Sequence, residues 1–124
     1  MADSDPSILI LDRRIDRDVL RPLVSAWFED MVKYVVDVEQ GRIAIGGELH
    51  ADAEEVLLQA GSRQRDLWGA NYYPGRGKEK CIEFTSLINI SPARGNKGME
   101  LLDPALRTRI QLLTWALIGE GEAL

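Results

Sequence analysis

The apolar residues of this chain fall into eight short segments separated by polar turns. Apolar runs and alternating patterns predict strands over residues 8–11, 31–39, 42–49, 66–73 and 81–90. Apolar stripes with helical spacing predict helices over residues 18–28, 53–60 and 104–118. No repeat or long linker separates these segments, so we expect a single domain over residues 1–124. Its ordered core would span about residues 7–118, between short acidic tails.

Residues suited to helix ends support two of the predicted helices. Asp52, with Glu55 three residues later, forms a capping box and predicts that a helix starts at residue 53. Asp103 followed by Pro104 is typical of the first turn of a helix. Pro22 lies inside the first predicted helix and indicates a late start or a kink near residue 21.

The segment over residues 31–49 is expected to form a hairpin around Gln40 and Gly41. A two-residue turn favours glycine, and such a turn fixes the strand register. Opposite charges then face each other twice, which supports the register. The predicted pairs are Val38–Ile43, Val36–Ile45, Tyr34–Gly47, Val32–Leu49, Glu39–Arg42, Lys33–Glu48 and Met31–His50.

The order strand-helix-strand-strand-helix-strand predicts an α+β fold with a mixed or antiparallel sheet. It matches the ferredoxin-like arrangement, extended by one further strand and a C-terminal helix. Right-handed crossovers would place the strands, numbered along the chain, in the order 5-4-1-3-2.

Composition narrows the class of protein without identifying its function. With 45% hydrophobic and 28% charged residues in a chain of 124, the protein is neither disordered nor membrane-spanning. The acidic start at Asp3 and Asp5, followed by only four apolar residues, is not a secretory signal, so we expect a soluble cytoplasmic protein. The single cysteine, Cys81, excludes an internal disulfide framework and a multi-cysteine zinc site.

The net charge of −5 argues against nonspecific binding to nucleic acid, which depends on neutralising phosphates. The charge is uneven, since residues 1–62 carry more acids than bases and residues 63–124 carry more bases than acids. This asymmetry would suit self-association of unlike faces, or it would simply solvate the surface.

Glu48, His50 and Asp52 form the sharpest candidate for chemistry. Residues two apart on a strand share a face, so the three side chains could bind a divalent transition metal. A structural explanation is favoured, however: Lys33 would pair with Glu48, Asp52 would cap a helix, and His50 would end a strand.

A second candidate is an anion site formed by Arg63, Arg65, Arg94 and Lys97. The predicted hairpin over residues 66–90 brings these four bases to one end. The surrounding loops match neither of the common phosphate-binding glycine patterns, and a solvated hairpin end is the favoured alternative.

The aromatic segment over residues 66–74 suggests either core packing, which is favoured, or a surface for contacts. Trp68 and Tyr72 share one face of the predicted strand. The last predicted strand has a partly apolar second face, which a second subunit could cover. We therefore expect a homodimer, through an exposed sheet edge or the face of the last two strands. No membrane partner is expected, and the small-molecule ligand is not identified.

Several stretches of the chain are similar to an uncharacterised family of small prokaryotic proteins. The resemblance rests on residues 46–54 (GGELHADAE), residues 66–74 (DLWGANYYP) and residues 86–90 (SLINI), and it covers most of residues 15–118. It implies a free-standing small protein and carries over no activity, cofactor or catalytic residue.

Three hypotheses on function remain open from the sequence. The first is a protein that acts by binding or self-association. The alternative is a metal-dependent hydrolase that uses Glu48, His50 and Asp52, and the third is an anion-binding module at the four bases.

Overall fold

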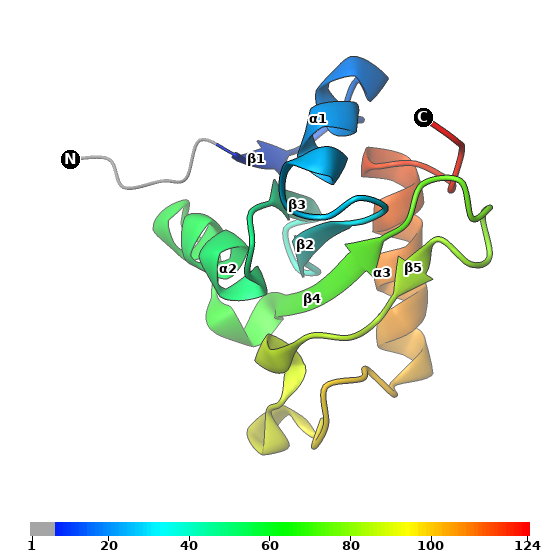
Figure 1. The fold of residues 1–124 in the computed structure, drawn as a ribbon. Coiled ribbons are helices and arrows are strands. Elements are labelled where there is room, and N and C mark those ends of the chain that lie inside the picture. Colours follow the sequence, from blue (N-terminus) through cyan, green and yellow to red (C-terminus); the bar gives the residue numbers. More distant parts are fainter. Residues whose placement is uncertain (1–6) are drawn as a thin grey trace.

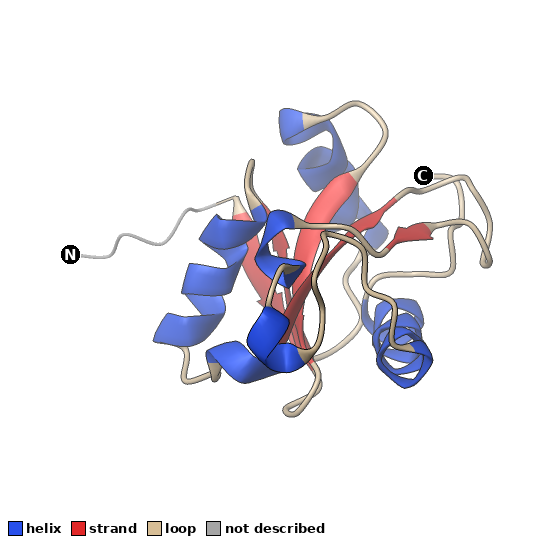
Figure 2. Cartoon of the chain, turned by 90° about the horizontal axis from the view of Figure 1, so that it is seen from below, coloured by secondary structure: helices blue, strands red, loops and turns tan. Residues whose placement is uncertain are grey.

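An open antiparallel sheet of five strands forms the centre of the protein, with helices on both of its faces (Figures 1 and 2). This computed structural model describes residues 7–124, and the predicted acidic N-terminal tail lies outside that range. None of the helices in the described range has the length and apolar character needed to cross a membrane. The elements are β1 (Ile8–Leu11), α1 (Arg17–Trp27), β2 (Val32–Asp37), β3 (Arg42–Gly46), α2 (His50–Gln59), β4 (Leu67–Tyr72), β5 (Ile82–Glu83), α3 (Pro104–Leu117) and the short 3-10 helices η1 (Gln64–Asp66), η2 (Leu87–Asn89) and η3 (Pro92–Arg94).

The α+β class is confirmed, but the predicted strand order is wrong. The strands lie in the order β1-β3-β2-β4-β5, so β1 is at an edge instead of the centre. β2 and β3 occupy inner positions, where nearly all of their residues are buried, whereas β1 has four residues and leaves Ile10 40% exposed. The helices α1 and α2 each connect strands that have another strand between them.

The β2–β3 hairpin forms with a register two residues away from the predicted one. Val36 lies opposite Ile43 and Tyr34 opposite Ile45, so residues 38–41 form the connection. The buried carboxylate of Asp37 causes this difference, because it accepts hydrogen bonds from the backbone amides of Glu39 (3.0 Å) and Gln40 (2.8 Å).

The predicted charge pairs across this hairpin, Glu39–Arg42 and Lys33–Glu48, are therefore wrong. Arg42 lies opposite Asp37, with 3.9 Å between Arg42 Nε and Asp37 Oδ2. The predicted faces survive, because a shift of two residues returns every side chain to the same side of the sheet.

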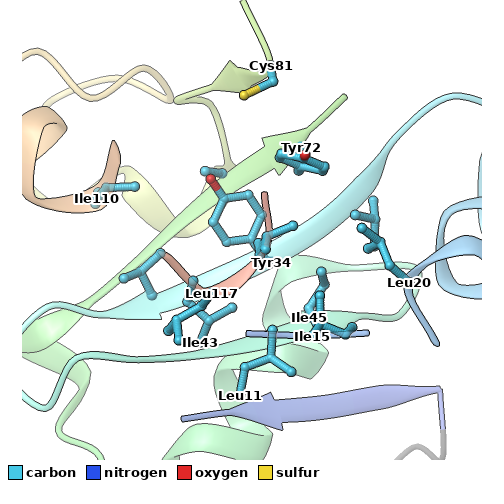
Figure 3. Close-up of a cluster of buried hydrophobic side chains, with 14 of the residues drawn as sticks. Leu11, Ile15, Leu20, Tyr34, Ile43, Ile45, Tyr72, Cys81, Ile110 and Leu117 are labelled. Atoms are coloured by element: carbon cyan, nitrogen blue, oxygen red, sulfur yellow. The ribbon is translucent and has the colours of Figure 1, made fainter. Parts of the chain in front are cut away.

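The larger core lies between the sheet and the helices α1 and α3. Figure 3 shows Tyr34, Ile43 and Ile45 on the sheet, together with Leu20 of α1 and Leu117 of α3. The Tyr34 hydroxyl lies 2.6 Å from Thr114 Oγ1, which fixes α3 against the sheet. The opposite face of the sheet packs on α2. The buried apolar residues of this smaller core, from the strands and from α2 together, are Ile8, Val35, Ala44, Ala53, Leu57 and Leu67.

The helix ends agree with the sequence at α3 and differ at α2. Asp103 caps α3, where its carboxylate accepts a hydrogen bond from the Ala105 amide (2.9 Å). The capping role predicted for Asp52 is wrong, because α2 begins at His50 and Asp52 lies in its first turn. Pro22 is accommodated inside α1.

The predicted strand over residues 81–90 is also wrong, because β5 contains only two residues. Residues 84–101 (the 84–101 segment) instead run along β4 as loops and 3-10 turns. The buried side-chain amide of Asn89 takes the place of a strand: its Oδ1 accepts from the Gly69 amide (2.8 Å) and its Nδ2 donates to the Gly69 carbonyl (2.9 Å). Arg94 Nη1 donates to the Leu67 carbonyl (2.8 Å).

We predict that Asn89→Ala destabilises the fold by about 3 kcal/mol, because it leaves the backbone groups of Gly69 buried without partners. Chemical unfolding measures this loss, and hydrogen exchange at the Gly69 amide should become faster. Lys97→Ala, at an exposed position nearby, is the control and should change the unfolding free energy by less than about 0.5 kcal/mol. An equal effect of the two variants would contradict the role of Asn89.

Candidate functional site

A pocket of about 290 Å³ opens beside the N-terminus of α2; we call it the α2 pocket. Its walls come from the start of α2, from β2 and β4, and from the 84–101 segment. Three apolar side chains at the pocket are unusually exposed for their type: Leu49 (53%), Leu87 (70%) and Met99 (42%). The lining residues are Lys33, Leu49, His50, Ala51, Asn71, Thr85, Ser86, Leu87, Ile88 and Met99.

A glycine in β4 allows the α2 pocket to form. A Cβ atom at Gly69 would lie 2.7 Å from Ser86 Oγ and 3.1 Å from His50 Cδ2. Any side chain at this position would therefore push apart two of the residues that line the pocket. Ser86 itself turns the chain into η2, because its Oγ accepts a hydrogen bond from the Ile88 amide (3.2 Å).

His50 is held in its neutral form by its surroundings. Its side chain is 8% exposed, and Nε2 lies 2.9 Å from the Ala70 carbonyl oxygen. A carbonyl only accepts, so Nε2 carries the proton and Nδ1 keeps a lone pair in the neutral ring. Burial lowers the pKa of His50 below its ordinary value, the hydrogen bond to Ala70 opposes this, and the charge of Lys33 lowers the pKa further.

Asn71 is a polar side chain whose amide group finds hydrogen-bond partners for only some of its atoms. It is 6% exposed, and its Nδ2 donates to Glu83 Oε1 (2.7 Å). Its Oδ1 is buried and accepts no hydrogen bond from the described residues. The nearby Asn71 side chain raises the pKa of His50, although burial outweighs this effect.

The residues predicted as metal ligands do not gather around one point. His50 is buried and bonded to Ala70, whereas Glu48 and Asp52 are exposed. Residues 7–124 contain no group of three or more His, Cys, Asp or Glu side chains that could hold a metal ion. The hypothesis of a metal site therefore gains no support from the arrangement of these side chains.

The four bases predicted as an anion site do not line one common hollow. Arg94 stacks on the Trp68 ring, with 3.6 Å to its centroid, and donates to backbone carbonyls of the neighbouring segments. Arg65 and Arg94 share one surface hollow, Arg63 and Arg65 share another, and Lys97 lines neither. Trp68 and Tyr72 are buried in the core, so the core-packing alternative for the aromatic segment is confirmed.

Sequence reasoning selected His50 and missed most of the other pocket residues. Asn71 left one signal, since it is an amide inside an otherwise apolar strand. Leu87 was noticed only as part of the partly apolar second face of the last predicted strand, and Met99 left no signal, because the place of both in the pocket depends on the path of the 84–101 segment.

We predict that the protein loses stability as the pH falls below about 6.5, the ordinary pKa of histidine. Since the folded-state pKa of His50 is lowered, the unfolded chain binds more protons in this range. Between pH 7.5 and 5.5 the loss should reach at most about 1.4 kcal/mol, measured by chemical unfolding. His50 is the only histidine, so His50→Gln should remove this slope. An unchanged slope in the variant would contradict the assignment.

Comparison with known proteins places the chain in a family without giving it a function. A search of curated proteins and a search of solved structures return no match. Residues 9–117 match a family described as "Protein of unknown function (DUF5674)". Because this match spans most of the chain, the protein belongs to that family of unknown function.

Proposed function

We propose that this protein binds a small, largely apolar molecule in the α2 pocket. The main support for this proposal is that Leu49, Leu87 and Met99 expose large apolar surfaces around the pocket. The same pocket contains the buried polar groups of His50 and Asn71. Apolar walls with a few placed polar groups are typical of ligand sites.

The dimensions of the pocket support a small ligand. Its volume of about 290 Å³ is at the lower end of the range for ligand pockets. Apolar surface that a ligand covers contributes about 25 cal/mol per Å², so the exposed walls supply a driving force without any charged contact.

The hydrogen bonding of His50 supports binding over serine-type catalysis. A serine nucleophile must hydrogen-bond to the free ring nitrogen of its base, which in His50 is Nδ1, and no hydrogen bond of the described residues joins the Ser86 hydroxyl to this ring. The hydroxyl of Ser86 is used to hold the start of η2. Both groups therefore act as parts of the pocket wall.

The neutral fluorescent probe N-phenyl-1-naphthylamine tests the proposal. We predict a saturable rise in its fluorescence with one site per chain. Leu87→Ser should weaken the binding at least fivefold, because it removes the most exposed apolar side chain of the pocket.

Leu112→Ser is the matched control, because Leu112 is 54% exposed on α3 and does not line the α2 pocket. It should leave the dissociation constant unchanged. Absence of saturable binding, or equal weakening by the two variants, would contradict the proposal.

A second candidate function is self-association through β1. No strand of the described range pairs with the outer edge of β1, and Ile10 of this apolar strand is 40% exposed. Asn89 and Arg94 cover much of the opposite edge of the sheet, at β4. An apolar edge with free backbone groups favours pairing with a second copy of the chain.

We predict a dimer at tens of micromolar in sedimentation velocity, converted to monomer by Ile10→Lys. The lysine places a charge at the edge without entering the core. Val19→Lys, at a similarly exposed position (42%) on α1, is the control and should leave the dimer intact. A monomeric wild-type protein would exclude this second candidate.

A further inference from the structure

We propose that the ligand of the α2 pocket is a neutral molecule in which a small apolar body carries an NH2 group, and that this group donates to the two unpartnered acceptors of the pocket, Asn71 Oδ1 and His50 Nδ1. This inference rests on the proposed binding function and specifies its ligand class. Three observations support it: an amide oxygen left over inside the protein, a ring nitrogen that only accepts, and a lysine that disfavours a cation.

The side-chain amide of Asn71 has a defined orientation that leaves its oxygen without a partner. Nδ2 donates to Glu83 Oε1 (2.7 Å) and to the Thr85 carbonyl oxygen (3.4 Å). A carboxylate and a carbonyl oxygen only accept, so the amide cannot be turned over. The side chain is more than nine-tenths buried, and Oδ1 accepts no hydrogen bond from the described residues. Because an unpartnered buried acceptor is costly, this oxygen indicates a donor that the described chain does not supply.

The ring of His50 presents a second acceptor to the same pocket. Since Nε2 donates to the Ala70 carbonyl (2.9 Å), the lone pair of the neutral ring lies on Nδ1. No hydrogen bond within residues 7–124 involves this nitrogen. His50 and Asn71 both line the pocket, so the pocket offers two acceptors to one ligand. An NH2 group supplies two N–H bonds to match them, whereas a carboxylate would bring only further acceptors.

Lys33 determines the charge of the donor group. It lies directly opposite Asn71 in the β2–β4 register and lines the same pocket. Its ammonium group is placed over the Phe28 ring, 5.1 Å from the centroid, and Asn71 Oδ1 stays without a partner in spite of this neighbour. The positive charge of Lys33 opposes the entry of a second cation, so the donor that fits the pocket is neutral.

The walls of the pocket define the rest of the ligand. The exposed surfaces of Leu49, Leu87 and Met99 favour an apolar body, because burying them removes apolar area from water. A volume of about 290 Å³ limits this body to a small ring or a short chain. An aromatic ring with a primary carboxamide combines the two requirements.

Four benzene derivatives of nearly the same shape test the donor and its charge separately. Benzamide carries a neutral NH2 group, acetophenone has a methyl group in its place, benzoate has only acceptors, and benzamidinium is a charged donor. At pH 8 we expect benzamide to bind with a dissociation constant about tenfold lower than that of acetophenone, since two hydrogen bonds distinguish them. Benzoate and benzamidinium should also bind more weakly than benzamide. NMR titration of the backbone amides of Ala51 and Leu87 measures the four constants.

Asn71→Leu removes one acceptor and keeps a side chain of similar volume. It should raise the dissociation constant of benzamide about fivefold and leave that of acetophenone unchanged, which also shows that the pocket is still folded. Gln59→Leu makes the same change at an exposed position of α2 that does not line the pocket. This control should change the binding of neither compound.

The ring nitrogens of the single histidine give a readout in the wild-type protein. At pH 8, well above the ordinary histidine pKa of about 6.5, saturation with benzamide should move the ¹⁵N resonance of Nδ1 upfield, because this nitrogen then accepts a hydrogen bond. Saturation with acetophenone should not move it.

Three results would overturn the assignment of an NH2 group while the pocket remains a ligand site. They are binding of acetophenone, benzoate or benzamidinium as tight as that of benzamide, no effect of Asn71→Leu on benzamide, and an unmoved Nδ1 resonance. Failure of N-phenyl-1-naphthylamine to bind would instead overturn the proposed function.

Discussion

The contact between the Asn89 side chain and the backbone of Gly69 determines how the 84–101 segment is held against the sheet. A strand at this position would satisfy the outer edge of β4 with its own backbone, but here one buried amide group does so from within a 3-10 turn. The backbone of the 84–101 segment is therefore free to leave the plane of the sheet. Because Leu87 and Ile88 lie directly before Asn89, the position of Asn89 also sets that of the wall they form.

The pocket thus results from the way in which a side chain, and not a further strand, hydrogen-bonds to the outer edge of β4. Gly69 serves both purposes, since its backbone bonds to Asn89 and its missing side chain admits Ser86 and His50. The positive charges at the pocket come from different elements, the N-terminus of α2 and Lys33 of β2. Their meeting depends on the neighbouring positions of α2 and β2 around the sheet.

The apolar pattern predicted most of the elements and their buried faces, because the spacing of apolar residues along a strand or helix shows which side chains share a face. It did not predict the hairpin register, which depends on hydrogen bonds from the Asp37 carboxylate to two amides. The alternation of Ile82, Phe84, Ile88 and Ile90 indicated a strand, and no sequence signal revealed that Asn89 and Arg94 would replace it. His50 was recognisable as a candidate because it is the single histidine, whereas Asn71, marked in the sequence only as an amide in an apolar strand, was placed at the same pocket by the position of β4 beside α2.

The interleaved order of the strands has a consequence for how the chain can fold. Only β2 and β3 are both adjacent in the sequence and paired through a tight connection, so this hairpin is the least costly pairing to close. Among the described strands β1 pairs with β3 alone, and β4 pairs with β2 along six residues but with β5 along only two, so both depend mainly on the formed hairpin. The sheet is therefore extended on both sides of the β2–β3 hairpin. In each case a helix, α1 or α2, connects two strands that have another strand between them. Such a dependence on distant pairings is associated with slow folding, in spite of the small size of the chain.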